Sequence, residues 1–160
     1  MSLGVHPFLH LLPHAAESPA LRRIAVSPAV RQRLLRTTEV MIDREDGFAW
    51  VDTDAVRIVL TEAYYGSGDP LDLYLDLLHE LTHIRQVFEG HDLWDPRFAY
   101  VDRITEIEGY AVAVEEGRRL GLTDEQVIEH LSNPWMTHAD VVRLLDNVHA
   151  YLNGTAPASG

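Results

Sequence analysis

The chain of 160 residues lacks cysteine altogether. This absence excludes a disulfide framework and any metal site built from thiolates. Long apolar runs are also missing, so no segment is long enough to span a bilayer. The N-terminal stretch, residues 1–23, has neither the basic start nor the uninterrupted apolar core of a signal peptide. We therefore expect a soluble, cytoplasmic protein with no membrane partner.

Positive charge is scarce, because 13 basic residues stand against 25 acidic ones and the formal net charge is −12. An acidic chain repels phosphate backbones, so we expect no nucleic-acid partner. The apolar share of 46% and the charged share of 24% are typical of a globular protein. The length suits one domain with a substantial core, which we place at residues 1–153.

Both ends of the chain are expected to lack regular structure. Residues 1–18 contain Pro7 and Pro13, which argue against a continuous helix. We therefore predict an irregular arm for this segment. The last segment, 154–160, reads GTAPASG and is predicted to be a disordered tail.

The middle of the chain changes from a strand-like to a helical pattern. Residues of about 38–61 contain three short stretches rich in β-branched and aromatic side chains, with Asp46-Gly47 between the first two. They predict a small antiparallel sheet, followed by a loop at 64–70. The sequence predicts helices at 28–38, 70–89 and 95–121. Capping boxes at 123–126 and 137–140 predict the starts of two further helices. The predicted fold class is α+β, with the sheet packed on the central helix at 70–89.

That central helix carries polar residues in an unexpected place. The segment LDLYLDLLHELTHIRQVFEG is strongly apolar, yet His79, Glu80 and His83 lie in its middle and fit the pattern H-E-x-x-H. Positions i and i+4 lie on one face of a helix, so the two imidazoles can meet a single zinc ion. Glu80 lies about 100° round the helix, where it can reach a metal-bound water without displacing it.

The polar residues of this helix share one stripe. On a helical wheel, Asp72, Asp76, His83 and Glu80 all follow His79 within about a quarter turn. Most other positions are apolar, which indicates a buried helix. A buried, unpaired carboxylate is costly, so the stripe should face metal, water or substrate. The alternative is a core helix whose histidines are satisfied by hydrogen bonds to neighbours.

A hydrolytic zinc site needs three protein ligands and one open position. His91 follows the glycine that ends the central helix and is a poor geometric fit. The next predicted helix offers Glu106 and Glu108. Geometry alone leaves both open as the third ligand.

The HELTH segment with a glutamate on the following helix resembles the gluzincin metallopeptidases. This resemblance implies that His79, His83 and a downstream glutamate bind one zinc ion, with Glu80 as the general base. The segment EIEGYA at 106–111 is similar to the E-x-E-A-x-x-x-A pattern of small bacterial zincins of the repressor-cleaving ImmA/IrrE type. It also looks like the E-x-x-A-D segment of a membrane-linked peptidase family. The first glutamate is the ligand in these patterns, so the resemblance implies Glu106 and a minimal, zincin-like fold.

One position departs from the gluzincin pattern. Many gluzincins place an aspartate four residues after the ligand, and Tyr110 stands there in this chain. Such an aspartate orients a ligating imidazole. Its role would have to pass to Asp76, Asp102, Glu108 or a backbone carbonyl.

The expected function is that of a zinc-dependent metallopeptidase acting on a peptide or protein substrate. Glu80 would take a proton from water, and Tyr110 would donate to the oxyanion, with Tyr100 and His138 as other candidates. The substrate would add to an edge strand at 48–52 or 55–61. The alternative is a zinc-binding regulatory or scaffold protein with the same fold and little or no proteolysis.

Overall fold

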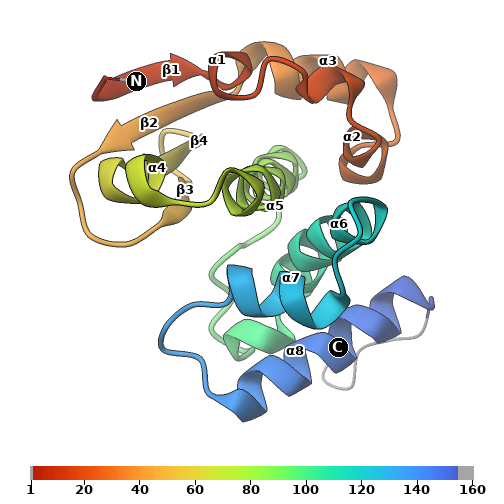
Figure 1. Cartoon of the computed structure of the whole chain (residues 1–160). Helices are drawn as coiled ribbons and strands as arrows, with labels where there is room; N and C mark the ends of the chain where they lie inside the picture. Colours follow the sequence, from red (N-terminus) through yellow and green to blue (C-terminus); the bar gives the residue numbers. More distant parts are fainter. Residues whose placement is uncertain (1, 155–160) are drawn as a thin grey trace.

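A computed structural model describes residues 2–154, which fold into eight α-helices, two 3₁₀ helices and a four-stranded sheet (Figure 1). The expected combination of helices with a small sheet is confirmed. The strands are β1 (Gly4–Pro7), β2 (Glu39–Asp43), β3 (Ala49–Asp52) and β4 (Arg57–Thr61). The helices are α1 (Phe8–Leu11), η1 (Ala15–Glu17), α2 (Ala20–Ile24), α3 (Pro28–Thr37), α4 (Glu62–Ser67), α5 (Pro70–Phe88), η2 (Tyr100–Asp102), α6 (Ile104–Arg119), α7 (Asp124–Leu131) and α8 (His138–Leu152).

The sheet is mixed, so the expectation of an antiparallel sheet is wrong. Its strand order is β1-β2-β4-β3, and β2 and β4 pair in parallel, with Val40 opposite Ile58. The other two pairs are antiparallel. β4 is buried at four of its five positions, whereas β3 is buried at one of four. Burial on both faces favours the central place for β4, which leaves β3 at the edge of the sheet.

The N-terminal segment is ordered rather than irregular. β1 pairs with β2, with Val5 opposite Met41, and the side chain of Phe8 is fully buried. Pro7 ends the strand, where a missing N–H does least harm to the ladder. A four-residue strand is too short to reveal itself by alternation, so only its pairing with β2 could disclose it. The expected disordered tail at 154–160 lies, apart from Gly154, outside the described residues.

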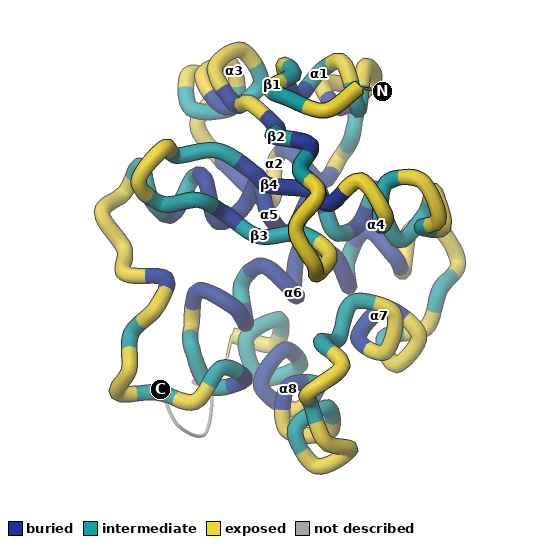
Figure 2. The backbone as a smooth tube through the Cα atoms, turned by 90° about the vertical axis from the view of Figure 1, so that its left-hand side faces the viewer, coloured by how far each residue is buried: buried dark blue, intermediate teal, exposed yellow. Residues whose placement is uncertain are grey.

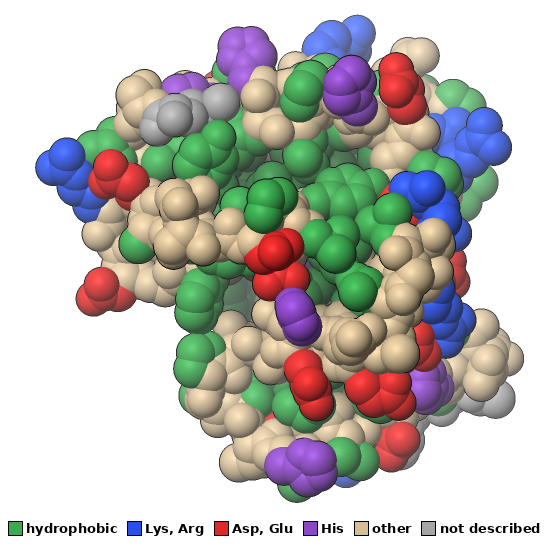
Figure 3. Space-filling model, viewed as in Figure 1, with side chains coloured by type: hydrophobic (Ala, Val, Ile, Leu, Met, Phe, Trp, Pro, Cys, Tyr) green, Lys and Arg blue, Asp and Glu red, His purple; other side chains and the backbone are tan. Residues whose placement is uncertain are grey.

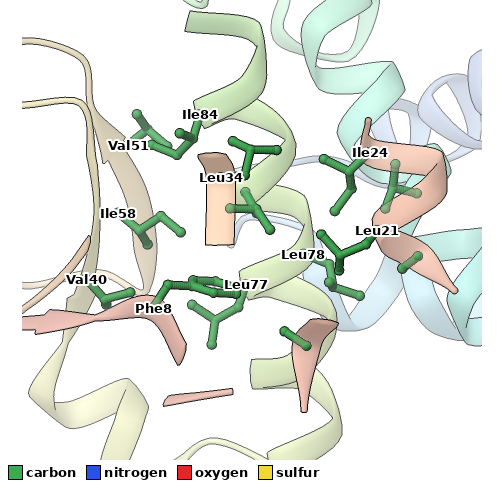
Figure 4. Close-up of a cluster of buried hydrophobic side chains, with 14 of the residues drawn as sticks. Phe8, Leu21, Ile24, Leu34, Val40, Val51, Ile58, Leu77, Leu78 and Ile84 are labelled. Carbon is green, nitrogen blue, oxygen red and sulfur yellow. The ribbon is translucent and has the colours of Figure 1, made fainter. Parts of the chain in front are cut away.

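The core lies on both sides of α5. Figure 4 shows Phe8, Val40 and Ile58 on the sheet side and Leu21 and Ile24 of α2 on the other, with α5 between them. A second cluster of buried residues joins α5 to α6, α7 and α8. The middle of α5 is therefore surrounded by protein, as the burial colours of Figure 2 show.

Local signals define α5 as the sequence predicts. The side chain of Asp69 accepts a hydrogen bond from the Leu71 backbone N–H at 2.8 Å, and Pro70 occupies the first position of the helix. Gly90 follows the helix with a φ of 83°, a conformation that favours glycine. The helix that begins at Ser27-Pro28 and the capping boxes of α7 and α8 are also confirmed.

Two segments differ from the predicted helices and loops. The expected loop at 64–70 is largely α4, whose first turn is capped by the Thr61 hydroxyl. The expected helix at 95–121 begins only at Ile104. Before it, the Asp95 side chain accepts a hydrogen bond from the Arg97 N–H at 3.0 Å. Such side-chain bonds give the backbone an alternative to helix.

Within residues 2–154, no helix is both long and apolar enough to cross a membrane.

Candidate metal centre

Three side chains from two helices converge on one point. The Nε2 atoms of His79 and His83 lie 3.1 Å apart, and Oε1 of Glu106 lies 3.0 Å from the first and 3.1 Å from the second. All three residues are buried. The two imidazoles come from adjacent turns of α5 and the carboxylate from the first turn of α6. The packing of α6 against α5 therefore decides that Glu106 joins the histidine pair.

These distances fit a single metal ion. Zinc bonds of about 2.0–2.1 Å in tetrahedral geometry place neighbouring donor atoms about 3.3 Å apart. Two imidazole nitrogens and one carboxylate oxygen also form a usual ligand set for catalytic zinc. His79, His83 and Glu106 could thus hold one ion, as the sequence and its resemblance predict.

Gln86 orients His83 from the next turn of α5. Its Oε1 lies 2.7 Å from Nδ1 of His83, and its Nε2 donates to the Thr105 backbone carbonyl at 3.0 Å and to Glu108 at 2.7 Å. Because an amide oxygen only accepts, Nδ1 of His83 must carry a proton. Nε2 is then the nitrogen available to a metal, which is the arrangement that outer partners of metal ligands impose.

Sequence reasoning missed this role of Gln86. The residue lies three positions after His83, and i,i+3 spacing on one helix face is the signal that could have found it. Glu108 acts through Gln86 and does not reach the ligand triad. Asp102 lies elsewhere, because its carboxylate accepts from Arg143 at 2.6 Å and from Asn147 at 3.0 Å.

His79 is held by packing on its far side. The ring of Tyr110 meets that of His79 edge to face, with centroids 4.5 Å apart. A Cβ added to Gly109 would lie 3.0 Å from Nδ1 of His79, so glycine at this position lets the two helices approach closely. Nδ1 of His79 is buried and has no hydrogen-bond partner among the described residues. Where the gluzincin pattern has an aspartate, Tyr110 therefore contacts the ring of His79 and makes no hydrogen bond to it.

Glu80 lies next to the triad as a buried carboxylate. Burial raises the pKa of Glu80 to about 7, and the nearby imidazoles of His83 and His79 reduce that effect. Burial likewise raises the pKa of Asp76, one turn earlier, to about 6. A carboxyl group whose pKa lies near neutrality is suited to exchange protons.

The ligand residues carry opposite pKa shifts. Burial alone would lower the pKa of His83, but the Glu106 carboxylate outweighs it and raises that pKa to about 10. Burial would raise the pKa of Glu106, but the imidazoles of His83 and His79 hold it well below its usual range. The triad thus places positive charge where its geometry would place a metal cation.

Two adjoining cavities, each of about 380 Å³, open onto the triad. Their walls have Ala49, His79, Glu80, Tyr100 and Asn133 in common, so they form one cleft across the site. Figure 3 shows one face of the molecule, where acidic side chains and a histidine gather between α5 and α7 beside a hollow.

The two halves of the cleft differ in chemistry. One half, which we name the tryptophan side, has walls formed by Trp50, Trp94, Trp135, Leu93 and Arg103. The other half, which we name the aspartate side, includes Asp69, Asp72, Asp76 and His130. An aromatic surface with one arginine, next to Glu80 and Glu106, thus lies opposite a surface with three further aspartates.

β3 forms one wall of the cleft. Ala49 belongs to both cavities, and Trp50 and Val51 belong to the tryptophan side. Within the described residues β3 pairs with β4 alone, so it is an edge strand. Of the two edge candidates in the sequence, 48–52 therefore lies at the site and 55–61 is central.

The three candidate oxyanion donors differ in how they lie relative to the cleft. The Tyr110 hydroxyl lies 3.0 Å from that of Tyr100 and donates to the Leu131 carbonyl at 3.1 Å. Tyr110 is 1% exposed, whereas Tyr100 borders both halves of the cleft. His138 is exposed at the start of α8 and is not among the residues that form either cavity.

The metal centre thus combines a buried His79–His83–Glu106 triad, an adjacent Glu80 and an open cleft. It could hold a metal ion and admit a further ligand from the cleft. Comparison with protein-family models, with curated proteins and with solved structures gave no match for this chain.

Proposed function

We propose that this protein is a zinc-dependent metallopeptidase that hydrolyses peptide bonds. The observation that carries this proposal is the convergence of His79, His83 and Glu106 within 3.1 Å of one another, with buried Glu80 beside them. Three protein ligands facing an open cleft are typical of catalytic zinc, whereas structural sites are closed by four.

Zinc fits this ligand set best among the common metals. Two histidines and one carboxylate also hold ferrous iron in some oxygenases. Glu80 supports zinc, because hydrolysis needs a proton acceptor next to the ligands and an acidic residue in that place suits it. Metal analysis of the purified protein separates the two ions directly.

The chain's own residues would divide the work as follows. A bound zinc ion supplies Lewis acidity, which polarises a carbonyl and acidifies water. Glu80 accepts a proton from the attacking water and passes it to the leaving amine. Tyr100 is the better placed of the two tyrosines to donate to the oxyanion, because it borders both halves of the cleft, whereas Tyr110 borders the aspartate side alone and is 1% exposed.

The peptide would lie along β3. Its free edge offers backbone groups to an extended chain, and residues Ala49, Trp50 and Val51 place that edge in the wall of the cleft. An edge strand, a helix with the histidine pair and a second helix with the glutamate are the parts of a zincin-like fold. We propose that this chain is a minimal form of it.

A second candidate is a zinc-binding regulatory or scaffold protein. The observation that favours it is Nδ1 of His79, which lies beside Tyr110 and has no hydrogen-bond partner within residues 2–154. Outer hydrogen bonds normally raise the basicity of a ligating imidazole, and their loss lowers metal affinity or activity about 10- to 100-fold. A site with one such bond missing could bind zinc and hydrolyse poorly.

The Glu80→Gln variant tests the proposed function. We expect it to keep stoichiometric zinc and to lose about 10²- to 10⁴-fold in kcat on a peptide library, because the proton acceptor is gone. Glu129→Gln, an exposed residue of α7, is the matched control and should keep wild-type activity.

Two results would contradict the proposal. If the purified protein holds no stoichiometric zinc, and His79→Ala changes neither metal content nor Tm, both zinc functions are wrong. If zinc is bound but the wild type cleaves peptides no faster than background and Glu80→Gln changes nothing, the peptidase hypothesis is wrong and the regulatory alternative stands.

A further inference from the structure

Arg103 lies in the wall of the cleft close to the metal centre. It is the residue before α6, three positions ahead of Glu106, and it belongs to the tryptophan side. Its Nε donates to the backbone carbonyls of Asp95 at 3.2 Å and Phe98 at 3.3 Å. Those two bonds fix the base of the guanidinium to the segment between α5 and α6.

Arg103 forms no ion pair with a carboxylate of residues 2–154, although carboxylates are abundant and that of Asp95 is near enough to feel its charge. Of the chain's arginines, seven form ion pairs with aspartate or glutamate among residues 2–154: Arg23, Arg44, Arg85, Arg97, Arg118, Arg119 and Arg143. No such pair joins Arg103 to a described residue. Its neighbour Asp95 is paired with Arg97 at 2.7 Å, and Glu106 is engaged by the two histidines.

The surroundings of Arg103 would strengthen binding to an anion. Among the described residues that form the cleft, it is the only arginine or lysine. Trp94, Trp135 and Leu93 form much of the wall around it. Arg103 is therefore the group of the cleft suited to a carboxylate, which a guanidinium binds through two parallel, charge-assisted hydrogen bonds.

We propose that Arg103 determines substrate specificity by binding a carboxylate of the peptide on the tryptophan side of the cleft. This inference rests on the proposed peptidase function and names its substrate class as peptides with an acidic side chain near the cleaved bond. The three tryptophans of the same half would accept neighbouring apolar side chains.

The direction of β3 predicts on which side of the cleaved bond this acidic residue lies. The strand runs from Ala49, which borders both halves, to Val51, which borders the tryptophan side alone. A peptide that adds antiparallel to β3, the more stable pairing, runs from the tryptophan side to the aspartate side. The acidic side chain then precedes the cleaved bond, whereas a C-terminal carboxylate would lie on the aspartate side among like charges.

The test uses matched peptides that are acetylated and amidated and differ only in Glu or Gln at one position. We measure kcat/KM with the zinc-loaded wild type, and Kd by calorimetry with zinc-loaded Glu80→Gln protein. We expect the Glu peptide to be favoured at least about tenfold in both measurements, from the strength of charge-assisted hydrogen bonds.

Variants at Arg103 identify the group responsible. Arg103→Gln should abolish the preference without changing zinc content, and Arg103→Glu should reverse it towards a Lys peptide, which a merely structural role would not do. Arg97→Gln is the matched control, because Arg97 lies on the same segment but not in the cleft. It should leave the preference intact.

Two further comparisons show which carboxylate Arg103 binds and distinguish this inference from the proposed peptidase function. A peptide with a free C-terminus, compared with its amide, shows whether Arg103 binds a terminal carboxylate instead of a side chain. Equal Kd values for Glu and Gln peptides, or a preference that survives Arg103→Gln, would overturn the inference. Because Kd is measured on the Glu80→Gln protein, this result is independent of whether the chain hydrolyses peptides.

Discussion

Gln86 holds one side of the candidate metal centre in place by hydrogen bonds. It is 1% exposed and joins three groups: the Nδ1 of His83, the Thr105 carbonyl and the Glu108 carboxylate. Nδ1 of His79 has no such partner in the described part of the chain. One of the two imidazoles is therefore fixed by hydrogen bonds and the other by the ring of Tyr110.

Gln86→Leu should weaken zinc binding about 10- to 100-fold, the usual cost of removing an outer partner of a metal ligand. Leucine fills the space but accepts no hydrogen bond from Nδ1 of His83. Competition with a chromophoric chelator measures the affinity. Thr82→Val is the control, because Thr82 is buried on the same helix and bonds only to the Leu78 carbonyl among the described residues. If both variants bind zinc as wild type does, the role assigned to Gln86 is wrong.

At the scale of the element, α6 connects two distant parts of the chain. Glu106 in its first turn completes the metal centre, and Glu116 near its end is fully buried. The Glu116 carboxylate accepts from Tyr74 of α5 at 2.5 Å, from Arg119 at 2.6 Å and from Ser18 at 3.1 Å. This network ties the N-terminal segment to the two helices that form the site.

Glu116→Gln should lower the free energy of unfolding by about 1–3 kcal/mol at pH 7, because it weakens several buried hydrogen bonds to a charged group. Burial would raise the pKa of Glu116, but bonds from Arg119 and Tyr74 lower it. Its contribution is therefore present above the usual glutamate pKa and is lost as the pH falls through the lowered value. Urea unfolding between pH 7 and acidic pH measures this.

Glu115→Gln is the matched control for that measurement. Glu115 is the preceding residue, pairs with Arg23 and is one-third exposed, so its loss should cost below about 1 kcal/mol. The role of Glu116 is refuted if the two variants unfold alike at pH 7, or if the wild type and Glu116→Gln lose stability equally as the pH falls.

At the scale of the whole molecule, the cleft lies where the sheet and the helical half meet. β3 comes from the N-terminal half, α5 lies in the middle, and α6 carries the third ligand (Figures 1 and 2). A metal bound by both helices would join the two halves. Its binding energy would then contribute to the stability of the folded chain.

Zinc in 100-fold excess over its Kd should stabilise the folded chain by about 2.7 kcal/mol, and a chelator should remove this gain. Thermal unfolding with and without the chelator measures the difference in Tm. His83→Ala removes a ligand and should make the Tm independent of zinc. A wild-type Tm that does not respond to zinc would show that the triad binds no zinc in the folded state.

Local signals explain what the sequence could predict. Three of the confirmed features involve residues at most four positions apart. They are the placement of His79 and His83 on one helix face, the Asp69-Pro70 start of α5, and the capping boxes of α7 and α8. Helix geometry fixes the relation of such residues wherever the helix lies. These features were therefore readable without the rest of the fold.

Features that depend on distant partners could not be read in this way. The short strand β1 can be recognised only from its pairing with β2. The central position of β4, and with it the edge position of β3, follows from the burial of β4 on both faces. Helix geometry alone does not decide between Glu106 and Glu108 as the third ligand, and only the resemblance to the gluzincins indicates Glu106. Gln86 is anchored by Thr105 and Glu108, 19 and 22 residues away, although its spacing of three from His83 is a local signal. The place of Arg103 in the cleft depends on residues from Ala49 to Trp135.

The amino-acid order is sufficient to predict the helix with the two histidines and Glu80, because a periodicity of 3.6 residues places the histidines on one face and Glu80 on the neighbouring one. Only the folded chain shows that Glu106 lies beside the histidine pair, as the resemblance implied, that β3 borders the cleft, and that Arg103 faces it with no ion pair to residues 2–154. The physical reason is that these relations come from the packing of α6 and the sheet against α5. That packing depends on the joint burial of side chains from the whole chain, which no short segment encodes.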